Sequence, residues 1–277
     1  MTWQITTSDL NSNVYIPQTS RHKHVIHSIW QMERINSFHT ENIIPKGIVE
    51  VIFNFDNSDP IPALVGSKQY HLSKCFINGF NTLTIHLQLP PEQEFFGVRL
   101  QPLAVKKIIG APGCEFLDMP VDLTLVDRSL STLWHQLAEQ TNFDERVDTF
   151  LEWIDQRLPQ LPPQEQLINE FLCSINQHDL SVTDLANSLC YSPRHLSRKL
   201  SEATGINTEE ILLYKKYLHA VHLIHHTERS LTEIAYQSHF SDQSHFIKTF
   251  KAYATLTPGE YKRNKSRLKG HLYKNVR

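Results

Sequence analysis

Two similar segments about fifty residues apart constrain this chain more than any other feature of its sequence. "SVTDLANSL" covers residues 181–189, "SLTEIAYQS" covers residues 230–238, and the two align without a gap. Each opens on a serine, which is a good N-cap, and places Asp184 or Glu233 three positions later, where a carboxylate favours the start of a helix. A duplication of this kind predicts two copies of one helical unit.

Each segment leads into a second short helix with a polar outer face. Ser192 and Pro193 begin that helix in the first unit, and Ser241 is the expected cap in the second. Two helices joined by a tight turn, the second with a basic outer face, are typical of a helix-turn-helix. The expected inward residues are Leu196, Leu200 and Ala203 in the first unit and Phe246, Phe250 and Tyr253 in the second.

A single helix is expected between the two units, over residues 208–227. At about 1.5 Å per residue it would span roughly 30 Å. That length is close to the roughly 34 Å between successive major-groove faces of B-DNA. The spacing therefore predicts that the second helix of each unit enters an adjacent stretch of major groove on one side of a duplex.

Residues 167–263 resemble the DNA-binding domain of the AraC/XylS family of transcription regulators. The small residue in each first helix is matched by Ala186 and Ala235. Three departures stand where the family pattern has glycine, namely Cys190, His239 and Thr255, and "INTEE" replaces the usual Ser-Pro start of the connecting helix. Further matches are Ser192, Leu196, Arg198, Ala220, Leu223, Ile224, Phe240, Ser244, Phe246, Lys248, Phe250, Lys251, Thr257, Pro258, Tyr261 and Lys262.

The family positions and the helical wheel together select candidate DNA contacts. An arginine can pair with guanine through two hydrogen bonds, whereas phosphate contacts add affinity without sequence information. The alternative for each single residue is an ordinary solvated surface charge. The expected base-reading residues are Arg194, Ser197, Arg198, Gln243, His245, Ile247 and Lys248. The expected phosphate contacts are Lys199, Lys251, Lys262 and Arg263.

The first part of the chain has a different pattern and a different charge. Residues 1–160 hold 12 Lys and Arg against 18 Asp and Glu, and residues 161–277 hold 15 against 11. Alternating apolar residues predict half-buried strands at 47–55, 82–89 and 94–100, and a 3.6-residue period predicts helices at 103–110 and 129–158. The expected fold class is an α+β, β-rich N-terminal domain with helices, followed by an all-α C-terminal domain with two helix-turn-helix units.

The proline-rich stretch "RLPQLPPQEQ" is the best candidate for a boundary, because proline interrupts both helices and central strands. The expected division is a sensor-like domain at 1–158, a linker at 159–166, the DNA-binding domain at 167–263 and a basic tail at 264–277. Residues 43–55 and 95–112 resemble the N-terminal domain of one subgroup of AraC-like regulators. That resemblance implies a β-rich, ligand-sensing domain and leaves the ligand open.

The cluster of His22, His24 and His27 raises the alternative of a metal-dependent, cupin-like β-barrel enzyme with accessory DNA binding. Against it, no nearby carboxylate or cysteine completes a ligand set, and the sequence has no paired carboxylates, GxSxG or GxxxxGK[ST] motif. We therefore expect no enzyme activity, no cofactor and no metal. Apolar stripes in residues 129–158 fit a core, or else half of a dimer interface.

The expected partner is double-stranded promoter DNA, with RNA polymerase and an unknown small-molecule effector as further candidates. Activation is the usual direction that the family resemblance implies, and a monomer and a homodimer both remain open. The sequence has no apolar run of about 18 residues, no secretory signal and only four widely spaced cysteines. We therefore expect no membrane partner and a cytoplasmic location.

Overall fold

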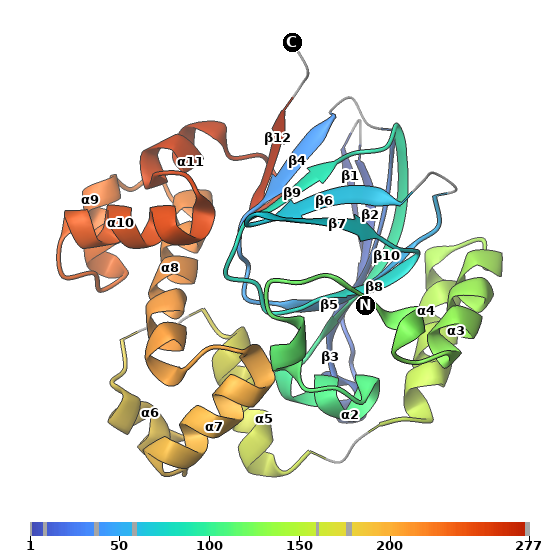
Figure 1. Ribbon diagram of the computed structural model, residues 1–277, viewed down its shortest axis with the longest axis horizontal. Coiled ribbons are helices and arrows are strands. Elements are labelled where there is room, and N and C mark those ends of the chain that lie inside the picture. Colours follow the sequence, from blue (N-terminus) through green and yellow to red (C-terminus); the bar gives the residue numbers. More distant parts are fainter. Residues whose placement is uncertain are drawn as a thin grey trace.

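The computed structural model describes residues 2–7, 10–35, 39–56, 60–158, 161–175 and 179–274. Two antiparallel sheets face each other in the N-terminal part, and helices build the C-terminal part beside them (Figure 1). This arrangement confirms the expected fold class, a β-rich first domain followed by an all-helical second one.

The larger sheet has the strand order β1-β2-β3-β10-β5-β8-β11, and the smaller has the order β12-β4-β9-β6-β7. The strands of the larger sheet are β1 Thr2–Thr7, β2 Leu10–Tyr15, β3 Ile26–Ile35, β10 Glu92–Leu100, β5 Val49–Asn54, β8 Cys75–Asn78 and β11 Val121–Asp122. Those of the smaller sheet are β12 His271–Lys274, β4 Thr40–Ile43, β9 Ile85–Gln88, β6 Ile61–Val65 and β7 Lys68–Leu72.

The central strands of the larger sheet are buried on both faces, not on one as the alternating pattern predicts. Val51 and Phe53 belong to the core that includes the helices, whereas Ile52 packs against the apolar cluster between the sheets. The Phe53 ring lies 6.1 Å from that of Phe96 and 6.4 Å from that of Phe150. Apolar contacts on both sides fix the register of this strand, because a one-residue slip would exchange its two faces.

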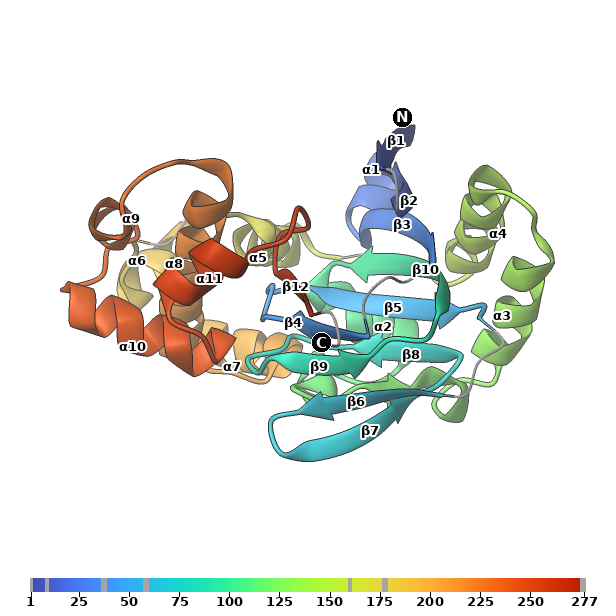
Figure 2. The ribbon, with the colours of Figure 1, turned by 90° about the horizontal axis from the view of Figure 1, so that it is seen from above.

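Two helices cover the outer face of this sheet, α3 Ser129–Glu139 and α4 Phe143–Asp155 (Figure 2). The sequence predicted helix without a break over 129–158, but Asn142 interrupts it by capping α4 through a bond from the Glu145 amide. Most apolar stripe residues of both helices are buried in the core, so the core interpretation of this segment is confirmed. The remaining short helices are α1 Ser20–Lys23, η1 Pro102–Ala104, α2 Val105–Ile109, η2 Gly113–Phe116 and η3 Leu123–Leu125.

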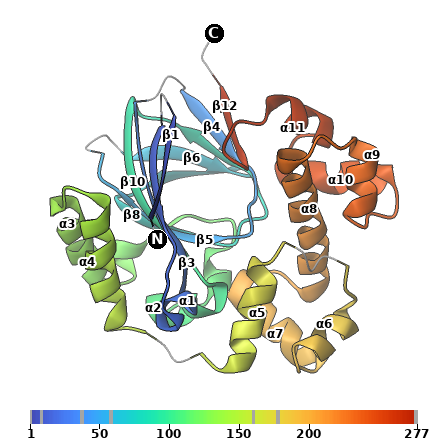
Figure 3. The ribbon, with the colours of Figure 1, turned by 180° about the vertical axis from the view of Figure 1, so that it is seen from behind.

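The C-terminal domain contains the duplicated units and the long helix between them. The α8 helix runs from the first unit to the second, with α7 near one end and α10 near the other (Figures 1 and 3). Pro163 already lies in the first turn of α5, so the second half of the expected linker is helical. The helices are α5 Pro163–Cys173, α6 Val182–Ser188, α7 Pro193–Thr204, α8 Thr208–His226, α9 Leu231–Gln237, α10 Gln243–Ala254 and α11 Pro258–Asn264.

The three departures from glycine all have left-handed backbone conformations. Cys190 has φ 57°, His239 has φ 56°, and Thr255 has φ 60° at the C-cap of α10. The fold therefore requires a glycine-like backbone at these turns although a side chain is present, which is a strained arrangement. The predicted Ser241 cap is wrong by one position, because the Asp242 carboxylate accepts the His245 amide instead.

The predicted basic tail is not a tail in this structure. Its residues 271–274 form β12, which pairs antiparallel with β4 of the N-terminal domain, with His271 opposite Ile43 and Tyr273 opposite Glu41. Four residues with one apolar side chain carry no periodic signal, so the sequence pattern could not indicate this strand.

The two domains share one continuous hydrophobic core. Tyrosines of α8 contribute to it and also bond across the boundary: the Tyr214 hydroxyl donates to the Asn81 carbonyl at 2.8 Å, and the Tyr217 hydroxyl donates to the Pro45 carbonyl at 3.2 Å. Gly47 lies directly against Leu218 and Tyr214, where an added Cβ would come within 2.7 Å of Leu218. The loop around Pro45 is therefore a docking surface for α8.

Candidate DNA-binding surface and ligand cavities

The α7 helix presents a polar face to solvent and an apolar face to the core. Ser192 caps it by accepting the His195 amide, and Leu196 and Leu200 are fully buried. On the opposite face, Arg194 and Arg198 are exposed and Ser197 is half-buried. This face can reach a major groove without any change in the packing of the unit.

Lys199 is placed differently from its prediction as a phosphate contact. Its ammonium forms an ion pair and hydrogen bond with Glu165 of α5, and Lys107 of α2 lies 3.9 Å from the same carboxylate. The Lys199 charge is therefore already partnered inside the protein, which weakens its assignment to DNA.

The α10 helix repeats the arrangement of α7. Phe246 and Phe250 are fully buried. Gln243 and Lys248 are exposed, and 39% of the Ile247 surface is accessible to solvent. His245 is half-buried; its Nδ1 lies 3.0 Å from the Ser241 hydroxyl and its ring 5.5 Å from that of Phe240. These contacts turn His245 toward its own unit, so it is the weakest of the four base-reading candidates here.

Of the other expected phosphate contacts, Lys251 and Arg263 are exposed. Lys262 is half-buried and its ammonium donates to the Arg229 carbonyl at 2.7 Å, which ties α11 to the loop before α9. Lys251 and Arg263 are thus better placed than Lys262 to meet a phosphate.

An apolar cavity of about 80 Å³ lies between the two sheets. Both sheets contribute its walls, and a few polar groups stand at one end. The principal apolar lining residues are Met32, Ile43, Ile52, Ile61, Leu72, Phe76, Leu87 and Phe95.

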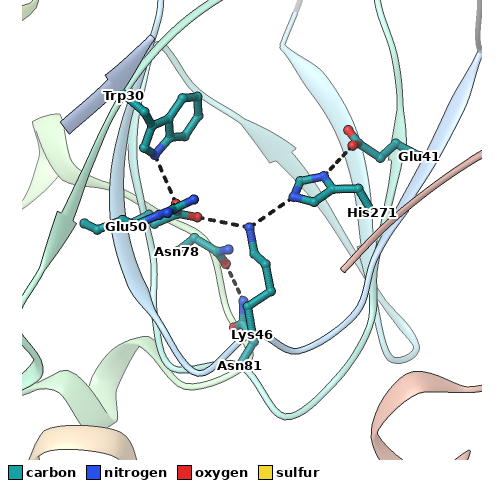
Figure 4. A network of polar contacts seen from close by, with 8 residues as sticks. Trp30, Glu41, Lys46, Glu50, Asn78, Asn81 and His271 are labelled. Atoms are coloured by element: carbon teal, nitrogen blue, oxygen red, sulfur yellow. Dashed lines mark hydrogen bonds and ion pairs between the residues drawn. The ribbon is translucent and has the colours of Figure 1, made fainter. Parts of the chain in front are cut away.

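A buried polar network closes that end of the cavity (Figure 4). Glu50 accepts from Trp30 Nε1 at 3.1 Å and from Arg99 Nε at 2.9 Å, and Lys46 Nζ lies 3.5 Å from its second oxygen. Burial opposes ionisation of Glu50, but Lys46 and Arg99 outweigh it and hold the pKa of this carboxyl at about 2. The carboxylate therefore remains charged across the physiological range.

His271 extends the network from β12. Its Nδ1 lies 2.7 Å from Glu41 Oε1, and its Nε2 lies 3.3 Å from Lys46 Nζ. With an acceptor on one side and an ammonium donor on the other, the ring must be neutral, with its proton on Nδ1. Burial and the neighbouring Lys46 lower the pKa of His271, in agreement with a neutral ring.

A second cavity of about 320 Å³ opens between the domains and shares Lys46 and His271 with the first. Positive side chains outnumber carboxylates in its lining, since Lys46, Arg99 and Lys269 face it. Their mutual repulsion contributes to the lowered pKa of Lys269, after burial. An anion entering this cavity would relieve that repulsion.

Comparison with known proteins agrees with this description of the helical half. A helix-turn-helix domain family matches residues 185–264. The HTH-type transcriptional activator RhaS of Enterobacter sp. (strain 638) is 29% identical over 101 residues, covering 35% of this chain and 36% of that protein. The chain therefore carries a helix-turn-helix domain of the kind found in transcription regulators. A second family, described only as a domain of unknown function (DUF6597), matches residues 16–122.

Other relatives match the helix-turn-helix domain over a short part of their length. The uncharacterized HTH-type transcriptional regulator SAS0078 of Staphylococcus aureus is 33% identical over 84 residues, and the chain spans 11% of its length. A solved AraC-type regulator from Chromobacterium violaceum is 26% identical, covers 32% of this chain and 79% of that one, and has a TM-score of 0.31. ToxT from Vibrio cholerae, solved with an unsaturated fatty acid, is 14% identical, with 94% and 97% coverage and a TM-score of 0.47.

Several residues of the buried polar network at the cavity were missed by sequence reasoning. The sequence positions of Lys46, Glu50 and Glu41 are typical of outward-facing polar residues, and His271 falls in the segment that was expected to be a tail. A buried charge next to an apolar strand gives no local signal, because its partners come from distant strands. A charged residue inside an otherwise apolar strand, such as Glu50, was the one hint available.

The His22, His24 and His27 cluster has separate surroundings in the structure. His22 Nε2 lies 2.7 Å from Asp155, whereas His27 Nδ1 lies 3.4 Å from the Ser28 hydroxyl. Within the described residues, no three His, Cys, Asp or Glu side chains gather in a way that could hold a metal ion. Among those same residues no helix is long and apolar enough to span a bilayer.

Proposed function

We propose that this chain is an effector-responsive transcription regulator that binds promoter DNA through both helix-turn-helix units. The observation that carries this proposal is the pair of exposed polar faces on α7 and α10, each opposite a fully buried apolar face. They stand at opposite ends of the 19-residue α8, which supports the idea of two neighbouring contacts on one duplex. RhaS is a transcriptional activator, and activation is the direction we propose here.

Arg198 and Lys248 are the sharpest test of base reading. The test duplex is one that the full chain selects from a random-sequence pool. Arg198→Ala and Lys248→Ala should each weaken binding to this duplex by roughly 1–3 kcal/mol. Binding to a scrambled duplex should weaken by a much smaller amount. Lys251→Ala should weaken both duplexes alike and make binding less salt-dependent, because a phosphate contact carries no sequence information. Fluorescence anisotropy at several salt concentrations measures both.

Lys68→Ala is the matched control, since Lys68 is an exposed lysine on β7, away from the AraC-type domain. It should change neither affinity nor the salt dependence. Equal losses on both duplexes for Arg198→Ala, Lys248→Ala and Lys251→Ala would refute the division into base-reading and phosphate residues.

For the effector, we propose a molecule with an apolar body and an anionic end. The cavity between the sheets offers apolar walls, and Lys46, Arg99 and Lys269 of the interdomain cavity offer a place for a negative charge. Lys46 stands where the two cavities meet. It is therefore the residue that we expect to contact the anionic group.

Decanoate and decanol separate the two parts of this proposal, because they share an apolar chain and differ in charge. Isothermal titration calorimetry should show tighter binding of decanoate than of decanol. Lys46→Met should lower the affinity for decanoate by about tenfold and leave the affinity for decanol unchanged. Lys74→Met, at an exposed lysine stacked over Trp134 on the far side of the domain, is the control. Equal affinities for decanoate and decanol would refute the anionic end of the ligand.

A further inference from the structure

The β12 strand joins the second helix-turn-helix unit to the edge of the sensor sheet, and it also contributes to the cavity floor. We propose that β12 is a latch: docked on β4, it holds the second unit against the N-terminal domain, and the Lys46–His271 contact makes that hold depend on the cavity. The latch rests on the proposed function only for its effect on DNA binding. The coupling between cavity and strand stands on the structure alone.

The connection from the second unit to β12 is short and well anchored. The α11 helix ends at Asn264 and β12 begins at His271. Between them, the Gly270 amide donates to the Tyr261 hydroxyl at 3.1 Å, and Tyr261 is fully buried with its ring 5.7 Å from that of Phe250. A displacement of β12 would therefore pull directly on the core that supports α10.

The connection from β12 to the cavity runs through one side chain. His271 lines both cavities, bonds to Glu41 on the paired strand and accepts from Lys46 on the loop that docks α8. A ligand group that entered the cavity and accepted the hydrogen bond of the Lys46 ammonium would remove that bond from His271. One of the contacts that keep His271, and hence β12, in place would then be lost.

The backbone of this strand pairs on one side alone, while its Leu272 side chain is buried in the core and Arg34 lies over its Tyr273 ring. Its four residues pair with a single neighbour, β4, and it forms the edge of its sheet. Short edge strands open at low free-energy cost compared with central ones, so a change of one buried contact can shift their docked population appreciably.

Hydrogen exchange of the full chain tests the coupling. Lys46→Met removes the donor to His271 but leaves Glu50 paired with Arg99 and Trp30. We expect the amides of β12 and β4 to exchange about tenfold faster or more in this variant, with a smaller rise in α10 and α11 and none in α7. Protection of β12 equal to that of the unmodified chain would overturn the proposal.

Leu72→Ala is the matched control for the cavity. Leu72 lines the same cavity but lies on β7, at the opposite edge of the sheet from β12. It should loosen its own edge and leave exchange at β12 within about twofold. Faster exchange at β12 in both variants would mean general loosening of the domain and would also overturn the latch.

A disulfide tests the effect on DNA. Thr40 and Lys274 are directly paired positions, so their Cα atoms lie at a separation that a disulfide tolerates. In a background with Cys114→Ser and Cys190→Ser, which removes the exposed thiols, Thr40→Cys/Lys274→Cys should lock the latch when oxidised. We expect oxidised protein to bind the selected duplex about fivefold or more weakly than reduced protein, because a locked second unit cannot adjust to the groove.

Each single-cysteine variant is the control, and its affinity should not respond to the redox state. Equal affinity of the locked and reduced forms would overturn the role of β12 in DNA binding. The proposed function fails separately: loss of selective binding in the reduced, unlocked protein would contradict DNA reading, whatever the latch does.

Discussion

The two helix-turn-helix units are copies in sequence but differ in how they meet the N-terminal domain. The first unit docks through the C-terminal end of α7, where Glu202 pairs with Lys106 at 2.5 Å and the Ala203 carbonyl lies against Gly113. The second docks through β12 and the hydroxyl contact of Thr84 with the Tyr253 carbonyl at 3.1 Å. If β12 is the latch proposed above, its edge pairing is the contact that can be released, so we expect the second unit to be the one that moves.

The cores of the two units also differ, and removing one large side chain from each should show the largest effect. Phe246→Ala should lower the free energy of unfolding by about 3–5 kcal/mol, and Leu196→Ala by about 2–5 kcal/mol, since both side chains are fully buried. Urea unfolding followed by circular dichroism measures both. If the units are independently held, the losses add in the double variant within about 0.5 kcal/mol; a clear departure would show that they are coupled.

A buried lysine distinguishes the first unit through its pH dependence. Lys215 of α8 donates to the Phe171 and Ser174 carbonyls at the end of α5, and burial lowers its pKa to about 8. Above pH 8 the folded chain loses this proton while the unfolded chain keeps it until about pH 10.4, so the contribution of Lys215 to stability should rise with pH between these values.

The expected rise amounts to at most about 3 kcal/mol, because each unit of pKa difference corresponds to about 1.4 kcal/mol. Urea unfolding from pH 7.5 to 10.5 measures it. Lys215→Met keeps the length of the side chain and removes the titrating group, so it should flatten the profile over this range. Identical pH profiles for the unmodified chain and Lys215→Met would contradict the assignment, because buried cysteines and tyrosines with raised pKa values affect both chains alike.

Gly113 offers a way to undock the first unit alone. An added Cβ would lie 2.0 Å from the Ala203 carbonyl oxygen, and backbone on both sides leaves little room to adjust. Gly113→Ala should destabilise the chain by about 1–3 kcal/mol and raise hydrogen exchange in α7 but not in α10. Gly259→Ala in α11 is the control, since its nearest neighbours are 3.5 Å away. Equal exchange changes in both units would argue against separate docking.

The turn residues give the smallest expected effect. Cys190→Gly should raise the free energy of unfolding by about 1 kcal/mol, because glycine relieves the left-handed strain of an exposed side chain. His239→Gly should raise the free energy of unfolding by less, since it also removes the contact of His239 Nδ1 with Asp179 at 3.1 Å. Thermal unfolding in parallel compares the two turns, and destabilisation by Cys190→Gly would show that no strain is present there.

Sequence reasoning succeeded where the determinants are local. Ser181, Ser192 and Ser230 all cap the helices that their spacing predicted, and the glycine-like turn at Cys190 was visible as a departure from a pattern. It failed where partners are distant. The pairing of Lys199 with Glu165 and of β12 with β4 joins segments that share no periodicity, so only the folded chain brings them together.

The same distinction holds for the candidate site. The exposed faces of α7 and α10 follow from helical periodicity, and most of their residues were correctly predicted to face outward. There are two exceptions: His245 turns toward its own unit, and Lys199 forms an ion pair with Glu165. The cavity network was not foreseen, because alternating strands indicate one buried face. Burial of the second face, which makes Glu50 an interior charge, depends on the packing of two sheets.

The pairing of β4 with β12 has a consequence for biosynthesis. The two strands are separated by about 230 residues. At typical translation rates of 5–20 residues per second, β12 is therefore synthesised roughly 10–45 s after β4. During that interval the nascent sheet has an open edge and its Glu41 lacks the imidazole. The N-terminal sheet is therefore complete only after the ribosome has passed both α7 and α10.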